Sequence, residues 1–127
     1  MEIQELQQGE EKLIYLAFTD ADGNVLNFAS LIEIIVLFKF NGNIFAQFSK
    51  TVKTDYARIT ANPLVASEGV VFISSATSKK FAVGELQMEV AVTRIESASP
   101  TGNLTDITTV PIFKVVDSLY KNVTWEL

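Results

Sequence analysis

The sequence contains neither cysteine nor histidine. Without cysteine, the chain forms no disulfide, offers no thiol nucleophile and supplies no thiolate to a metal; this is typical of proteins from a reducing compartment. Without histidine, it lacks the usual general base near neutral pH, the common imidazole ligand of zinc and the partner that activates a serine nucleophile. Metal-free catalysis would therefore depend on carboxylates, lysine or tyrosine.

Positive charge is also scarce. The 127 residues include ten Lys and Arg against fifteen Asp and Glu, which gives a formal charge of −5 and a pI near 4.6. The basic residues are scattered, and Lys79-Lys80 is the only basic doublet. Because a nucleic-acid site needs a basic stripe or patch, the composition predicts no nucleic-acid partner. The six glycines are equally dispersed, so the sequence has no glycine-rich phosphate loop.

Long hydrophobic runs are missing as well. No apolar stretch approaches the roughly 20 residues that a membrane-spanning helix needs. Residues 1–11 hold four glutamates and only isolated apolar side chains, in place of the apolar segment of a secretion signal. We therefore expect synthesis in the cytoplasm and no membrane partner.

The dominant pattern is an alternation of apolar and polar residues with a period of two, which is typical of β-strands. The length predicts a single domain, and the absence of crossover helices excludes a parallel α/β fold. We expect an all-β, antiparallel β-sandwich over residues 9–118, an N-terminal arm over 1–8 and a C-terminal tail over 119–127. About seven strands are predicted, over residues 11–18, 31–40, 44–50, 56–59, 70–73, 85–95 and 104–116.

At most one short helical turn is expected, between Ser74 and Val83. Ser75 or Thr77 could cap its beginning and Gly84 could end it. Two turns of helix are the most that this segment could hold.

Residues 31–50 predict a β-hairpin with unusually apolar strands. A three-residue loop over Asn41-Gly42-Asn43 would join them. The register that aligns the apolar side chains places Phe40 opposite Ile44, Phe38 opposite Ala46 and Val36 opposite Phe48. One face of the hairpin then carries a continuous apolar ladder.

The other face of the first hairpin strand is also partly apolar. It carries Leu31, Glu33, Ile35, Leu37 and Lys39, where a face exposed to water would be polar throughout. We therefore predict that Ile35 and Leu37 are covered, either by the same domain or by another chain. The pattern leaves both possibilities open, and Ile35 and Leu37 become candidate partner contacts.

The clearest half-buried strand spans residues 85–95, where Leu86, Met88, Val90 and Val92 alternate with mostly polar residues. Residues 97–103 then predict an exposed hairpin loop, followed by the strand 104–116. Pro111 lacks the backbone N–H that a sheet needs, which predicts an edge strand or a bulge at that point.

Two groups of acidic residues have a spacing that could carry chemistry. Asp20, Asp22 and Asn24 resemble the start of a calcium loop, but their spacing to the next glycine and glutamate does not match one, and an Asp-Gly turn explains the same residues. Glu85 and Glu89 could act as paired carboxylates. Their strand alternates so regularly that we interpret Gln87 and Glu89 as part of a solvated face. No catalytic, cofactor-binding or metal-binding residue is predicted.

The aromatic residues separate into two groups. Phe18, Phe38, Phe40, Phe48 and Phe72 occupy strand positions and predict a core. Trp125 lies in the C-terminal tail, where an isolated tryptophan is costly unless it docks. It either contacts a partner or packs on its own domain. With Tyr120 and Val123 it completes the set of candidate partner contacts.

The order of these segments resembles the small immunoglobulin-like domain of tailed-bacteriophage upper baseplate, tail and neck proteins. The resemblance covers residues 9–118. It is carried by the first strand and Asp-x-Asp-Gly turn over 9–24, the hairpin over 31–50, the serine- and threonine-rich turn over 74–77 with the strand after Gly84, and the closing Phe-x-Val strand at 113–115. Two departures are Leu86 and Met88, which replace an aromatic residue, and the absence of a receptor-binding or coiled-coil segment after Val116.

The resemblance implies a non-enzymatic, free-standing adaptor of the virion, assembled in the host cytoplasm from several copies of itself and other virion proteins. It implies no cofactor. An alternative from a different class is a cellular carbohydrate- or peptide-binding β-sandwich. A third and minor alternative is a carboxylate-based enzyme.

Overall fold

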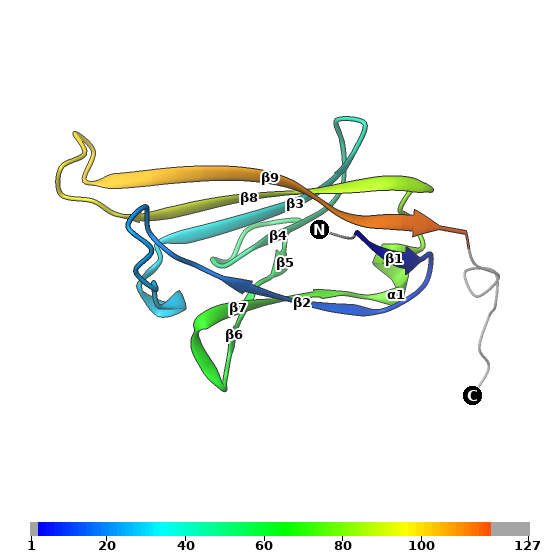
Figure 1. Cartoon of the computed structure of the whole chain (residues 1–127), viewed down its shortest axis with the longest axis horizontal. Coiled ribbons are helices and arrows are strands. Elements are labelled where there is room, and N and C mark those ends of the chain that lie inside the picture. Colours follow the sequence, from blue (N-terminus) through cyan, green and yellow to red (C-terminus); the bar gives the residue numbers. More distant parts are fainter. Residues whose placement is uncertain (1–2, 118–127) are drawn as a thin grey trace.

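The computed structural model describes residues 3–117, which form two β-sheets facing each other (Figure 1). One sheet has six strands in the order β1-β9-β8-β3-β4-β5, and the other has three in the order β2-β7-β6. The strands are β1 (Gln4–Gln7), β2 (Lys12–Ala17), β3 (Glu33–Phe40), β4 (Asn43–Ser49), β5 (Ala57–Arg58), β6 (Thr60–Asn62), β7 (Val65–Ile73), β8 (Gly84–Ile95) and β9 (Asn103–Val116). Two short helical segments are the 3-10 turn η1 (Phe28–Ser30) and α1 (Ser75–Ser78).

The all-β prediction is confirmed, but the strand count and the pairing need correction. Residues 3–117 form nine strands instead of about seven, and two of the pairings are parallel: β1 with β9, and β4 with β5. The two additional strands, β1 and β6, are short. They span four and three residues, too few for a period of two to be visible in the sequence.

The expected N-terminal arm is also corrected. Residues Gln4–Gln7 form β1, which pairs in parallel with residues 113–116 of β9. Leu6 is the anchor of this strand, because its side chain is completely buried in the core. The segment was missed because a single apolar residue in Gln-Glu-Leu-Gln carries no alternating pattern.

The predicted register of the central hairpin is confirmed away from the turn and corrected near it. Val36 lies opposite Phe48 and Phe38 opposite Ala46, as predicted. Beyond them the register shifts at a bulge, and Phe40 lies opposite Asn43 instead of Ile44. The turn therefore contains only Asn41 and Gly42, whose φ angles are 49° and 81°. Asn-Gly favours this two-residue turn because both residues tolerate positive φ.

The core lies between the two sheets. β3 contributes Ile34, Val36 and Phe38, all fully buried. The Phe38 ring meets Phe48 edge-on at 5.6 Å between centroids and lies 6.0 Å from Phe81. Alternation along each strand sends one set of side chains into this layer and the other set outward.

Phe72 is the exception among the predicted core aromatics. Phe18 and Phe48 are buried like Phe38, and Phe40 is half-buried, but Phe72 is 47% exposed. Its neighbours Val71 and Ile73 are completely buried, so alternation turns Phe72 outward. Residues 70–73 are all apolar, so the sequence does not show which of their side chains face the core.

The β8–β9 hairpin agrees with the sequence. Its loop follows Ile95 and ends before Asn103. Pro111 lies at a bulge, since Leu86 pairs with Phe113 while Gln87 pairs with Pro111. It also precedes the part of β9 that β1 covers. Proline fits here because a bulge interrupts the regular hydrogen-bond ladder of the sheet.

The helical turn is present but begins differently from the prediction. Ser74 is the cap, accepting a hydrogen bond from the Thr77 backbone N–H at 3.1 Å. Gly84 starts β8 instead of ending the helix. The chain leaves the helix early because Phe81, only 1% exposed, turns into the core.

Candidate functional site

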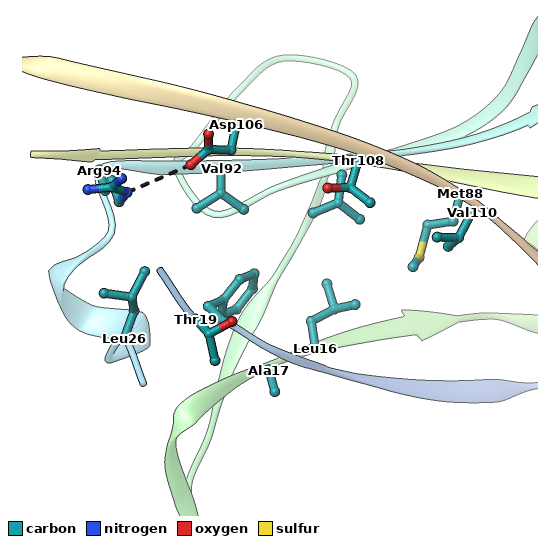
Figure 2. Close-up of a pocket in the computed structure, with 12 residues that line it drawn as sticks. Leu16, Ala17, Thr19, Leu26, Met88, Val92, Arg94, Asp106, Thr108 and Val110 are labelled. Atoms are coloured by element: carbon teal, nitrogen blue, oxygen red, sulfur yellow. Dashed lines mark ion pairs between the residues drawn. The ribbon is translucent and has the colours of Figure 1, made fainter. Parts of the chain in front are cut away.

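An open groove lies between the two sheets, along the edge formed by β2, β8 and β9 (Figure 2). Its volume is about 290 Å³. Side chains from β8 and β9 line one wall, and side chains from β2 and the segment after it line the other. The apolar part of the lining consists of Leu16, Ala17, Phe18, Leu26, Met88, Val90, Val92 and Val110.

One end of the groove is polar. The Nε atom of Arg94 lies 3.7 Å from Oδ2 of Asp106, and its Nη1 lies 3.2 Å from Oε2 of Glu96. The Nε atom is buried and has no hydrogen-bond partner among the described residues. The hydroxyl-bearing Thr108 lies between this ion pair and the apolar end (Figure 2).

The groove is open because β9 is longer than the strands around it. β9 has fourteen residues, but β1 pairs only with its last four, residues 113–116. Within residues 3–117, no strand pairs with the outer edge of β9 between Asn103 and Val110. β2 is likewise an edge strand, paired only with β7. Two incompletely paired strand edges therefore border one apolar groove.

A second apolar surface lies on the outer face of the three-stranded sheet. Leu13 pairs with Phe72 across β2 and β7, and Tyr15 pairs with Val70. Leu13, Tyr15 and Phe72 are 50%, 54% and 47% exposed. Exposed apolar clusters of this kind mark contact surfaces in soluble proteins.

The predicted contacts Ile35 and Leu37 lie on the outer face of the six-stranded sheet, and both are half-buried. Ile35 lies between Ser49 and Ala91, and Ala91 pairs on its other side with the exposed Ile107. Leu37 is flanked by polar residues, Gln47 and Glu89. The neighbouring strands thus shield part of this face, and a narrow apolar row remains at the surface.

Three predicted contacts, Tyr120, Val123 and Trp125, lie outside the described residues. Ile35 and Leu37 are on the opposite face of the large sheet from the groove, so the structure does not bring these two residues and the groove together. The groove itself was not predicted. The alternation in residues 85–95 identified one of its walls, but no local signal indicates where the opposing sheet ends.

Two of the acidic residues that could carry chemistry, Glu89 and Asp20, have other partners. Glu89 pairs with Lys39 at 3.4 Å. Asp20 closes its own turn, since Oδ1 accepts hydrogen bonds at 2.9 Å from the backbone N–H groups of Asp22 and Asn24. The hydrogen bonds from Asn24 lower the pKa of Asp20 below its ordinary value. Across residues 3–117, no three acidic side chains gather as metal ligands would.

Neither helical segment of residues 3–117 approaches the length of a membrane-spanning helix. Comparison with known proteins finds no match for this chain among protein-family models, curated proteins or solved structures.

Proposed function

We propose that this protein is a non-enzymatic structural component of a tailed-bacteriophage virion, acting in the tail, baseplate or neck through multi-copy protein-protein assembly. The observation that carries the assembly role is the set of unfilled apolar surfaces: the groove, the outer cluster around Phe72 and the row at Ile35. Small all-β domains bury such surfaces against other chains. The assignment to a virion is supported in addition by the order of segments over residues 9–118, which resembles that of the phage domain.

The strand order supports an immunoglobulin-like sandwich. In that fold the second, fourth and fifth strands form one sheet, and the third, sixth and seventh form the other. Here β2, β6 and β7 share one sheet, while β3, β8 and β9 form the centre of the other. β4 and β5 extend the larger sheet beside β3, as the extra strands do in variable-type domains. The inter-sheet disulfide of antibody domains has no counterpart, because the chain has no cysteine.

A cellular peptide- or carbohydrate-binding module is the alternative. The exposed Tyr15 and Phe72 favour it, since aromatic side chains on an open sheet face can stack against a sugar or a peptide. The groove also has the mixed apolar and polar lining that a peptide requires.

The position of the gene among its neighbours separates the two functions. Adjacent tail or capsid genes would support the virion component, whereas a metabolic or surface-sugar operon would contradict it. If a phage carrying the gene is identified, mass spectrometry of purified particles provides the direct test. We expect the protein in intact particles at more than one copy, and its absence from them would refute the proposal.

A further inference from the structure

We propose that the groove accepts the C-terminal segment of a second copy of this chain. Residues Val123–Leu127 of one copy would add a strand to the free edge of β9 in the next, with alternate side chains entering the groove. The inference rests on the proposed function in one respect, multi-copy assembly, and it names the contact that would build the assembly.

The acceptor is the outer edge of β9 between Asn103 and Val110. An unpaired strand edge presents backbone N–H and C=O groups that can bind an extended segment. The same edge already holds a strand further along, because β1 pairs with residues 113–116. An added strand would continue the six-stranded sheet from the point where β1 leaves it.

The groove lies where such a strand would project its side chains. On β9, Asp106, Thr108 and Val110 face the groove, and Leu16 and Leu26 face them from the other wall (Figure 2). Alternate side chains of a strand are about 7 Å apart. Three of them therefore span about 14 Å, which is shorter than the edge of eight residues from 103 to 110.

The C-terminal segment has the matching pattern. Val123, Trp125 and Leu127 alternate with Thr124 and Glu126, the period-two pattern of a strand with one buried face. The apolar set would fill the groove, with the large Trp125 at its centre, and the polar pair would face solvent. An aromatic residue in a central, desolvated position is the usual anchor of a protein interface.

The reach of the chain favours a second copy over the same one. Asp117 follows the C-terminal end of β9, whereas the β9 residues that line the groove, 106–110, lie toward its N-terminal end. The seven-residue distance back to Val110 is about 23 Å along a strand, whereas the six residues from Asp117 to Val123 span at most about 20 to 22 Å when fully extended. β1 also occupies the edge along this path. Because donor and acceptor are different parts of the chain, two copies can exchange segments as a closed dimer, or successive copies can join head to tail as a ring or filament.

The test uses three single variants of the full chain. Trp125→Ser removes the anchor from the donor. Thr108→Arg places a long cation in the groove at an exposed position of β9. The matched control is Thr109→Arg, because Thr109 is the next residue of the same strand, is also exposed and faces away from the groove.

Sedimentation velocity over a dilution series measures assembly. We expect wild type and Thr109→Arg to form concentration-dependent oligomers, and Trp125→Ser and Thr108→Arg to remain monomeric with unchanged circular dichroism. A wild-type chain that stays monomeric at all concentrations overturns the inference. Equal assembly of Thr108→Arg and Thr109→Arg overturns it as well.

Binding of a labelled peptide with the sequence of residues 118–127 identifies the occupant. The acceptor is the Trp125→Ser chain, whose groove the donor would leave empty. Introducing Thr108→Arg into this acceptor should weaken binding by about tenfold or more, and Thr109→Arg should have little effect. The segment could instead dock on its own copy. In that case the wild type would be monomeric and would not bind the peptide, whereas the Trp125→Ser chain would bind it, and this result would contradict the inference.

These measurements need only purified protein, so they fail independently of the virion assignment. A chain found in particles that does not self-associate would retain the proposed function and lose this contact. A chain that self-associates through the groove but is encoded beside metabolic genes would retain the contact and lose the virion role.

Discussion

The hydroxyl oxygen of Ser78 lies 3.0 Å from the backbone nitrogen of Gly9, a residue 69 positions earlier in the chain, and accepts a hydrogen bond from it. The same hydroxyl donates to the carbonyl oxygen of Glu10 at 2.7 Å. Ser78 is completely buried. It therefore joins the short helix α1 to the connection between β1 and β2, at the place where the chain passes from one sheet to the other.

Replacing Ser78 with alanine should lower the free energy of unfolding by about 1 to 3 kcal/mol, because a buried N–H and a carbonyl lose their partner. Chemical denaturation measures this change. Ser97→Ala, in the exposed loop between β8 and β9, is the control and should change stability by less than about 0.5 kcal/mol. Equal effects of the two substitutions would contradict a structural role for the Ser78 contacts.

Glu33 should make stability depend on pH in the acid range. Its burial raises its pKa, but hydrogen bonds from the side chain and backbone of Thr51 and from the backbone N–H groups of Ile34 and Lys50 together lower it, so the pKa lies below its ordinary value of 4.5. A carboxyl whose pKa is lower in the folded state stabilises the fold above its unfolded pKa. This stabilisation is lost as the pH falls through the folded value.

Glu33→Gln should therefore lower stability near pH 7 by about 1 to 2 kcal/mol, less than for a deeply buried carboxylate because Glu33 is partly exposed. The free energy of unfolding of this variant should also fall less steeply with decreasing pH below about pH 4.5 than that of the wild type. Urea denaturation at a series of pH values provides the measurement. The control Glu11→Gln removes an exposed carboxylate and should retain the neutral-pH stability. An unchanged acid dependence in Glu33→Gln would refute this prediction.

Gly84→Ala should be strongly destabilising for two reasons. The φ angle of Gly84 is +132°, and a Cβ atom there would lie 2.7 Å from Cε2 of Phe40. We expect a loss of about 2 to 4 kcal/mol, seen as a lower melting temperature. Gly23→Ala is the matched control, because φ is +83° but no atom lies within 4 Å of the added Cβ. It should cost only about 1 kcal/mol, and a similar cost at both sites would show that the Phe40 contact is unimportant.

Leu37→Lys should leave the isolated domain folded, because the long lysine side chain can extend from the half-buried outer face into water. If a partner covers this face, the same change should abolish assembly, since a desolvated contact rejects an unpaired charge. Phe38→Ala, the next residue but fully buried, should instead cost about 3 to 5 kcal/mol. Thermal melts and sedimentation of both variants provide the comparison. A Leu37→Lys chain that does not fold would place this face in the core of the domain.

Local patterns accounted for much of the fold. The alternation in the central hairpin predicted that Val36 pairs with Phe48 and Phe38 with Ala46, because a one-residue slip would turn every side chain to the wrong face. The two-residue turn at Asn41-Gly42 was within reach of the same reasoning, since Asn-Gly is the strongest short hairpin signal. The three-residue loop predicted over Asn41-Gly42-Asn43 is wrong, because a bulge beyond Phe38 shifts the register by one residue and brings Asn43 into the strand.

By itself, the sequence determined the all-β class, the central hairpin, the position of Pro111 and the absence of thiol and imidazole chemistry. These features depend on composition or on residues a few positions apart. Only the tertiary structure decided that Gln4–Gln7 pairs with residues 113–116, that Phe72 faces outward and that a groove opens beside residues 103–110. Each of these depends on which strand edge meets another, and that pairing is set by packing between segments up to about a hundred residues apart, which no local periodicity records.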